Sequence, residues 1–140
     1  MLDDYQAQSL PLAVIALDID HFKTINDHFG HDVGDAVIVS LATLMQQDLR
    51  ADAALCRSGG EEFLLLLPGV SGVQAERIAE RLRLRVESHE MGQAGCITIS
   101  LGVAHWPGDA SDLGAVLKQA DKALYQAKHR GRNCVVVAGA

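Results

Sequence analysis

The feature that most restricts the fold is a pair of short apolar segments separated by two glycines. Residues 54–57 (Ala-Leu-Cys-Arg) and 63–67 (Phe-Leu-Leu-Leu-Leu) flank the sequence Ser-Gly-Gly-Glu at 58–61. Strand-like segments joined by a glycine-containing turn are typical of a β-hairpin, whose strands are antiparallel. Gly59 and Gly60 can adopt positive φ at such a turn, and they would let a ligand approach the main chain. A purely parallel sheet is therefore excluded.

The rest of the chain alternates between strand and helix patterns. Strands are expected at residues 11–18, 96–104 and 134–137, and helices at residues 36–49, 75–86 and 113–127. The helices are expected because apolar residues recur in them at intervals of three and four, and Gly131 is suited to end the last one. The sequence thus predicts an α+β fold with helices packed on a mainly antiparallel sheet.

Length, composition and charge narrow the class of protein. A chain of 140 residues with 49% hydrophobic content suits one domain over residues 1–140. It has neither an apolar run long enough to span a membrane nor a secretion-type start, so we expect a cytoplasmic location. The net charge of −6 disfavours nucleic acid and anionic membranes as partners. Cys56, Cys96 and Cys134 lie in apolar runs, and we expect them to be reduced and buried.

Four carboxylates lie beside segments that should be buried. Asp18 and Asp20 end the first strand and share a face while the strand lasts, whereas Glu61 and Glu62 should point to opposite faces. A buried carboxylate needs a cation or hydrogen-bond donors. If the first strand neighbours the hairpin, Asp18 and Glu61 converge, and their oxygens suit Mg²⁺ or Mn²⁺. The alternative is that these acids are solvated turn residues.

A polar segment with two glycines follows the first strand, at residues 23–35, and we expect it to be a loop. Lys23 is placed to bind a phosphate, while Asn26 and Asp35 offer hydrogen-bonding groups to a base. An ionised Asp35 would accept the ring N–H and the amine of guanine and would disfavour adenine. The histidines of this segment are interpreted as surface residues, since no tetrahedral zinc set is completed.

A second basic cluster, Lys-His-Arg-Gly-Arg at residues 128–132, follows the last expected helix. Cations are favourable at a helix C-terminus, which is the simpler explanation of this cluster. Next to an acidic metal site, the same side chains would also suit a polyphosphate.

Five motifs together resemble, in order and spacing, the GGDEF-domain diguanylate cyclases, with GGEEF as the variant of the signature. The motifs are DIDHFK (18–23), NDHFGHDVGD (26–35), RSGGEEF (57–63), TISLG (98–102) and ADKALYQAK followed by GRN (120–133). The resemblance covers nearly the whole chain. Glu62 matches the second acid of the signature, and its role stays open.

The resemblance implies a fold similar to the nucleotidyl cyclase and polymerase palm. It also implies an enzyme that condenses two GTP into cyclic di-GMP and releases two pyrophosphates. Each domain would carry one GTP, so two copies must face each other, at least transiently, as a homodimer. An unidentified sensory or receiver domain is expected in the full-length protein.

The same resemblance assigns roles around the metal and the phosphates. Asp18, the carbonyl of Ile19 and Glu61 would hold Mg²⁺, with Mn²⁺ as a possible substitute, and Glu61 would also help to deprotonate the attacking 3′-hydroxyl. Lys23 would stabilise charge on the phosphates, with Arg57 as a further helper.

The nucleotide itself would be held by residues from two further motifs. By the resemblance, Asn26, His31 and Asp35 would line the guanine nucleotide site. Lys128 and Arg132 would bind the triphosphate.

The chain departs from the family pattern at two places. Many members carry Arg-x-x-Asp as an inhibitory product site, but residues 50–53 read Arg-Ala-Asp-Ala, so we expect no tight inhibition by product there. Members also usually begin with Asp-x-Leu-Thr and a full helix, whereas only the last turns of that helix are expected here. The short start favours an alternative, a non-catalytic module that binds GTP or a protein. The complete set of acids and phosphate-binding residues favours the enzyme.

Overall fold

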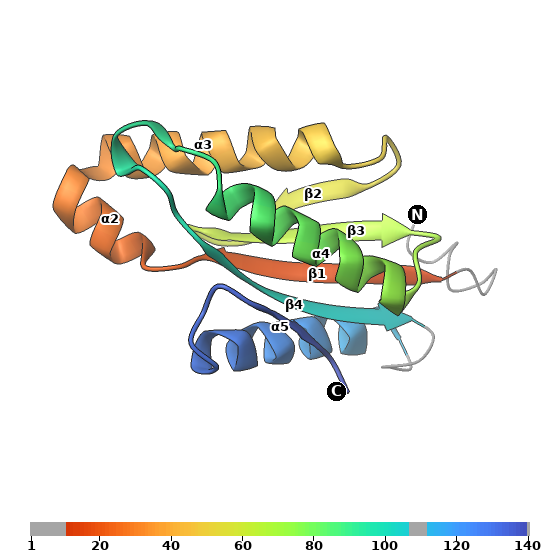
Figure 1. Ribbon diagram of the computed structural model, residues 1–140. Helices are drawn as coiled ribbons and strands as arrows, with labels where there is room; N and C mark the ends of the chain where they lie inside the picture. Colours follow the sequence, from red (N-terminus) through yellow and green to blue (C-terminus); the bar gives the residue numbers. More distant parts are fainter. Residues whose placement is uncertain (1–10, 107–111, 140) are drawn as a thin grey trace.

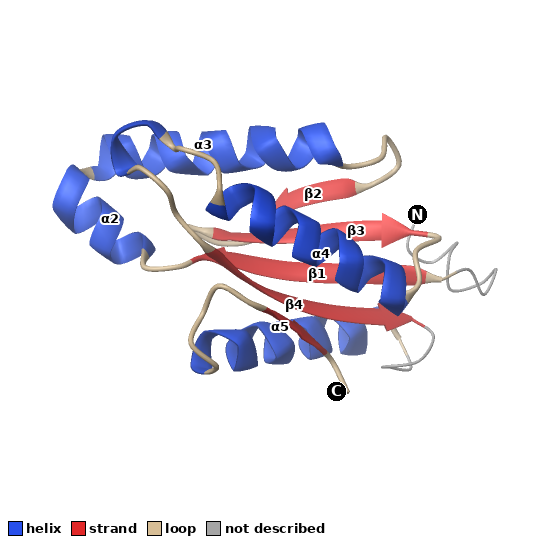
Figure 2. Ribbon diagram, viewed as in Figure 1, coloured by secondary structure: helices blue, strands red, loops and turns tan. Residues whose placement is uncertain are grey.

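The computed structural model describes residues 11–106 and 112–139, so the helix turns expected before the first strand lie outside the described residues. Within these ranges the chain forms, in order, β1 (Leu12–Ile19), α2 (Phe22–Phe29), α3 (His31–Asp48), β2 (Ala54–Arg57), β3 (Glu62–Pro68), α4 (Gly72–Glu87), a 3₁₀ turn (Gly92–Ala94), β4 (Ile99–Trp106), α5 (Leu113–His129) and β5 (Val135–Val137) (Figure 2). No described helix is both long enough and apolar enough to cross a membrane.

The strands form one sheet in the order β2-β3-β1-β4-β5. Neighbouring strands within the sheet are antiparallel, except for β4 and β5, which run parallel. The predicted hairpin is confirmed as β2 and β3, and the α+β class with a mainly antiparallel sheet is confirmed with it. In this register Asp18 of β1 lies opposite Glu62 of β3 and Ser100 of β4. The end of β1 is therefore adjacent to the start of β3.

Helices cover both faces of the sheet, which explains why β1 is apolar without alternation. Figure 1 shows α4 in front of the sheet and α5 on the opposite side. Ile15 and Leu17 of β1 belong to the core formed with α3 and α4. Val14 and Ala16, which point the other way, pack against α5. Every residue of β1 is buried as a result.

The expectation of a loop at residues 23–35 is wrong. These residues form most of α2 and the first turns of α3. The two helices meet at Gly30, whose φ of 95° ends α2, and its N–H donates to the Asn26 carbonyl at 2.8 Å. Only Ile25 of α2 is buried, so the apolar pattern of this short helix was too sparse to indicate it. The polar side chains of the segment consequently project from helices.

The expected burial of the cysteines is also wrong. Cys56 and Cys96 are exposed, Cys134 is partly buried, and all three thiols are free. Cys56 is exposed because β2 is an edge strand, which covers less of its surface than a central strand does. Cys96 precedes β4 and pairs with Glu90 in an isolated bridge. A local apolar pattern does not distinguish an edge strand from a central one.

Candidate active site

A cavity of about 280 Å³ opens where β1 ends. The turn between β2 and β3, the start of α2 and the end of α5 come together there, at the left of Figure 1. The cavity is lined by Asp18, Ile19, Asp20, His21, Phe22, Lys23, Thr24, Glu61, Lys128 and Arg132. The predicted metal-binding and phosphate-binding residues therefore share one cavity, although they are distant in sequence.

One carboxylate oxygen of Asp18 is buried and has no partner among the residues that the structure describes. Its residue is 5% exposed, and one oxygen, Oδ2, forms an ion pair with Lys128 of α5. The other, Oδ1, is buried and accepts no hydrogen bond from the described residues. Burial raises the pKa of Asp18, the ion pair with Lys128 opposes this, and the negative charge of Glu61 adds to it. An additional cation would relieve the cost of this buried charge.

Glu61 reaches the same cavity from the hairpin. The Ile19 N–H donates to the Glu61 carbonyl at 3.3 Å, which ties the end of β1 to the turn. Two carboxylates and the nearby Ile19 carbonyl are oxygen donors of the kind that Mg²⁺ prefers, with water or phosphate completing its shell. The described residues contain no group of three His, Cys, Asp or Glu side chains placed for a metal. The oxygen atoms of Asp18, Ile19 and Glu61 are of the chemical type that Mg²⁺ prefers.

Glu62 lies outside the cavity lining and faces Asp121 of α5. Burial raises the pKa of Glu62, and the carboxylates of Asp121 and Asp18 raise it further. The two adjacent glutamates therefore occupy different surroundings, one lining the cavity and one between β3 and α5.

The two glycines of the turn do not use the positive φ that glycine permits. Instead, Arg57 fixes the turn by donating to the carbonyls of Gly59 at 3.3 Å and Gly60 at 2.9 and 2.6 Å. A Cβ atom on Gly60 would meet nothing within 4 Å, so the space beside it is open. The glycines thus leave room for a ligand, and Arg57 shapes the turn without lining the cavity.

The residues predicted for guanine lie on α2 and α3 and are not part of the lining of this cavity. Asn26 is on α2, while His31 and Asp35 are exposed on the first turns of α3. The Asn26 Oδ1 atom is buried without a hydrogen bond to any described residue, and it lies against Gly34. A Cβ on Gly34 would come within 1.8 Å of that oxygen. The close packing of α2 on α3 thereby places Asn26 next to the residue that precedes Asp35.

Asp20 lines the same cavity as Asp18, but its carboxylate has different partners. Because β1 ends at Ile19, the Asp20 side chain turns toward β4. It accepts hydrogen bonds from Ser100 Oγ at 2.6 Å, Thr98 Oγ1 at 2.7 Å and the Asn133 N–H at 2.9 Å. Sequence reasoning gave Asp20 no separate role, and the alternating hydroxyls at 98 and 100 were the available signal.

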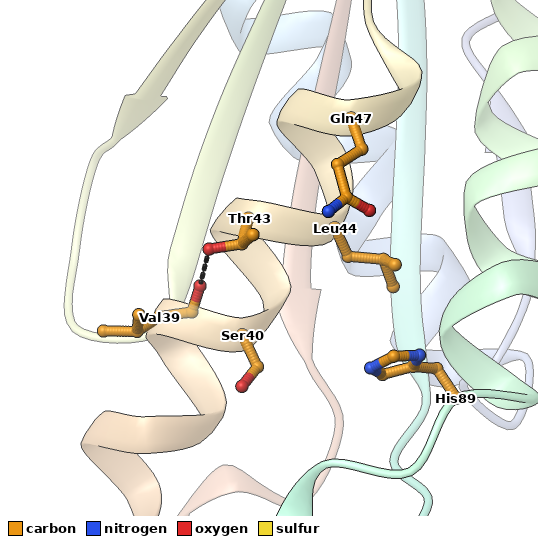
Figure 3. Close-up of a pocket in the computed structure, with 6 residues that line it drawn as sticks. All are labelled: Val39, Ser40, Thr43, Leu44, Gln47 and His89. Carbon is orange, nitrogen blue, oxygen red and sulfur yellow. Dashed lines mark hydrogen bonds between the residues drawn. The ribbon is translucent and has the colours of Figure 1, made fainter.

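A second cavity, of about 200 Å³, lies between α3 and the segment after α4. Figure 3 shows its lining, in which Thr43 Oγ1 donates to the Val39 carbonyl at 2.9 Å. It is lined by Val39, Ser40, Thr43, Leu44, Gln47 and His89. This lining has neither a carboxylate nor a lysine or arginine, and none of the predicted site residues contributes to it. The cavity at the end of β1 is therefore the candidate active site.

Comparison with models of protein families shows which family this chain belongs to. The sequence profile described as "Diguanylate cyclase, GGDEF domain" matches residues 2–134. The chain belongs to the GGDEF family. The recognition made from the five motifs is thereby confirmed.

Individual relatives are similar to this chain in sequence. The response regulator PleD of Caulobacter vibrioides is 43% identical over 131 residues, which are 90% of this chain and 29% of PleD. The probable diguanylate cyclase DgcT of Escherichia coli is 41% identical over 136 residues, 94% of this chain and 30% of DgcT. The chain thus spans less than a third of these relatives.

Solved GGDEF and GGEEF domains have the same fold as this chain. The active GGEEF domain of a diguanylate cyclase from Vibrio cholerae superposes with a TM-score of 0.92 at 35% identity, covering 99% of this chain and 89% of that one. The GGDEF domain of DgcB from Caulobacter crescentus, in complex with c-di-GMP, gives a TM-score of 0.91 at 32% identity, covering 99% and 84%.

Residues 50–53 stand where the Arg-x-x-Asp motif is expected, and the Arg50 side chain forms hydrogen bonds within the chain. Arg50 donates to the two oxygens of Asp52 at 3.2 and 3.1 Å and to the Pro68 carbonyl at 2.6 Å. Asp52 therefore engages Arg50 directly, while Ala53 stands where the Arg-x-x-Asp motif has its aspartate. An arginine whose donors are satisfied in this way offers few of them to a ligand.

We predict that cyclic di-GMP does not bind tightly at Arg50. Calorimetric titration of the wild-type protein is the measurement, and Ala53→Asp, which completes Arg-x-x-Asp, is expected to gain tight binding. Tight binding by the wild type that Arg50→Ala abolishes would contradict the prediction.

Proposed function

We propose that this chain is a diguanylate cyclase, which condenses two GTP into cyclic di-GMP and two pyrophosphates. The observation that supports it most is the buried Asp18 Oδ1, which has no hydrogen-bond partner in residues 11–106 and 112–139. Asp18 lines one cavity with Glu61 and the cationic side chains. Membership of the GGDEF family supports the same reaction. The substrate, partners and activity of the whole protein are part of this proposal.

Asp18, the Ile19 carbonyl and Glu61 would hold Mg²⁺ or, in its place, Mn²⁺. When bound, the ion would neutralise charge on the α-phosphate and lower the pKa of the attacking hydroxyl. The hard oxygen donors and the buried Asp18 Oδ1 support this assignment. Glu61, which is partly exposed at the turn, would accept the proton of the 3′-hydroxyl.

The cationic side chains of the cavity would bind the triphosphate. Lys23 enters it from the first turn of α2, and Lys128 and Arg132 enter from the end of α5 and the turn that follows. Three positive charges around one cavity compensate a polyphosphate locally in a chain that is acidic overall. The ion pair with Asp18 also holds Lys128 at the cavity.

The base would be recognised from α2 and α3. Asp35, which is exposed, would accept hydrogen bonds from the ring N–H and the amine of guanine, and Asn26 and His31 would also contact the nucleotide. Adenine has an acceptor at the corresponding ring nitrogen, so it would leave Asp35 unpaired.

Ring closure requires two chains. Each 3′-oxygen would form a bond to the α-phosphorus of the GTP held by the other chain, and pyrophosphate would leave from that phosphorus. The reaction rate per chain should therefore rise with protein concentration. A fused sensory or receiver domain would regulate this pairing, and a cytoplasmic location remains our expectation because GTP is the proposed substrate.

The test is incubation of the purified chain with GTP and Mg²⁺, followed by separation of the nucleotides. Wild type should form cyclic di-GMP, and Asp35→Ala should lower its formation and its preference for GTP over ATP. Asp32→Ala, an exposed acid on the same helix, is the matched control. Binding of GTP without product, even at high protein concentration or after fusion to a dimerising domain, would favour the non-catalytic alternative.

Gly34→Ala tests the placement of Asn26. The new methyl group collides with Asn26 Oδ1, and the amide has to move away because it is the end of a flexible side chain. We expect about a fivefold to tenfold loss of GTP affinity, equal to one lost hydrogen bond, with little loss of stability. Binding is measured by calorimetry. The substitution should have no further effect in an Asn26→Ala background, and additive losses would count against this role.

A further inference from the structure

The turn that follows α5 has an unusual backbone. Gly131, Arg132 and Asn133 have φ values of 115°, 64° and 48°, so three consecutive residues lie in the left-handed region. Glycine adopts this region freely, but arginine and asparagine do so at a cost, and such residues persist where the surrounding structure holds them. Arg132 lines the candidate active site. The conformation of this turn therefore decides where a cation of the site lies.

The main chain of the turn is held by Asp20. Asp20 is 5% exposed, and its Oδ2 accepts from the Asn133 N–H at 2.9 Å and from Thr98 Oγ1 at 2.7 Å. Its Oδ1 accepts from Ser100 Oγ at 2.6 Å. Both oxygens are thus occupied by donors of the protein, in contrast to the free oxygen of Asp18.

The side chain of the same turn is held by α4. Asn133 Oδ1 accepts from Arg83 Nη1 at 3.0 Å, and Asn133 Nδ2 donates to Glu87. Arg83 is itself ion-paired with Glu80, and its side chain is only 16% exposed. Asn133 is therefore fixed from two directions, through its N–H and through its amide group, and Arg132 is the residue directly before it.

We propose that Asp20 is a positioning residue, which holds the turn at residues 131–133 so that Arg132 faces the phosphates of the substrate. It acts as an acceptor of three hydrogen bonds and not as a ligand of the metal. This inference rests on the proposed function, because it assigns Arg132 to a triphosphate. It separates the two acids of the DIDHFK motif into one that faces the ligand and one that supports the site.

Asp20→Asn and Asp20→Ala distinguish this role from metal binding. In Asp20→Asn, the amide oxygen can take the place of Oδ2 and its NH₂ can donate to Ser100 Oγ, since a hydroxyl both donates and accepts. All three contacts are then kept. An amide replaces a metal-binding carboxylate poorly, because its carbonyl oxygen can still be a ligand but carries no negative charge, and its NH₂ cannot bind Mg²⁺. Alanine removes every contact.

The measurement is calorimetric binding of a GTP analogue with a methylene group between the α- and β-phosphorus atoms, in Mg²⁺. We expect Asp20→Ala and Arg132→Ala each to weaken binding about tenfold or more, because both remove the charge-assisted contact between Arg132 and a phosphate. Asp20→Asn should stay within about threefold of wild type, the change expected when hydrogen bonds are kept. Asp20→Ala combined with Arg132→Ala should bind no more weakly than Arg132→Ala alone.

Amide hydrogen exchange gives a second readout, which does not depend on ligand. Exchange at Asn133 should accelerate in Asp20→Ala and not in Asp20→Asn. Should Asp20→Ala fail to fold, Thr98→Val removes a single contact and is expected to weaken binding partially and to accelerate the same exchange.

Two outcomes would overturn the inference: equal losses in Asp20→Asn and Asp20→Ala, or additive losses with Arg132→Ala. If the wild-type chain does not bind the analogue at all, the proposed function fails, and this positioning role for phosphate binding fails with it.

Discussion

Replacing Glu61 by glutamine is expected to lower the rate of cyclic di-GMP formation by about 10³-fold. The change removes an oxygen of the proposed metal site and the proposed proton acceptor together, and loss of a general base alone costs about 10²- to 10⁴-fold. GTP affinity should change far less, because the groups assigned to the base and the phosphates are untouched. The measurement is the initial rate at saturating GTP over a range of Mg²⁺ concentrations.

The control for this prediction is Glu76→Gln, which makes the same chemical change at an exposed position of α4. It should leave the rate unchanged. Stability of both variants should equal that of wild type, since Glu61 lies at a turn and is partly exposed. A Glu61→Gln enzyme that keeps most of the wild-type rate would remove Glu61 from the proposed mechanism.

Gly102→Ala is expected to cause the largest loss of stability. Gly102 is buried in β4, and a Cβ on it would lie 2.2 Å from Leu124 N and 2.3 Å from the Ala120 carbonyl oxygen. These atoms belong to the main chain of α5, so only a shift of the whole helix relieves the collision. Overpacking of this kind costs about 3 kcal/mol, which corresponds to a fall in Tm on the order of 10 °C. Chemical denaturation measures the free energy of unfolding.

The same shift should weaken nucleotide binding, because Lys128 is carried by α5. Gly114→Ala is the matched control: Gly114 is exposed at the start of α5, and a Cβ there meets only Asp112 Oδ1 at 3.4 Å. Alanine in a helix is more favourable than glycine by about 0.5–1 kcal/mol, so this control should be neutral or slightly stabilising. A Gly102→Ala protein as stable as wild type would show that α5 packs less closely than described.

The elements that could be predicted from the sequence are those whose pattern lies in a short stretch of the chain. The hairpin was predictable because two apolar segments flank a glycine turn, and α4 and α5 because their apolar residues recur with helical spacing. The expectation that Asp18 and Glu61 share a site followed from one further assumption, that β1 neighbours the hairpin. The sheet order supports that assumption, because β1 pairs with β3.

The misinterpreted features depend on which surfaces neighbouring elements cover. Residues 23–35 resemble a loop because only one residue of α2 is buried, and the helix is stabilised by its packing on α3. Cys56 appears suited to the core, yet it lies in a strand at the sheet edge. Burial is a property of the assembled layers, so a local pattern gives only a partial indication of it.

Sequence alone determined the family, the α+β class and the residue types brought to the site, because the motifs and the hydrophobic periodicity are local in the chain. Only the tertiary structure decided how those residues divide their tasks. In the folded chain Lys128 pairs with Asp18 across 110 positions, and Asp20 binds Asn133 across 113. One buried oxygen of Asp18 has no partner within the described part of the chain. Contacts between residues so far apart form when α5 packs on the sheet, and the chain carries no local pattern that records them.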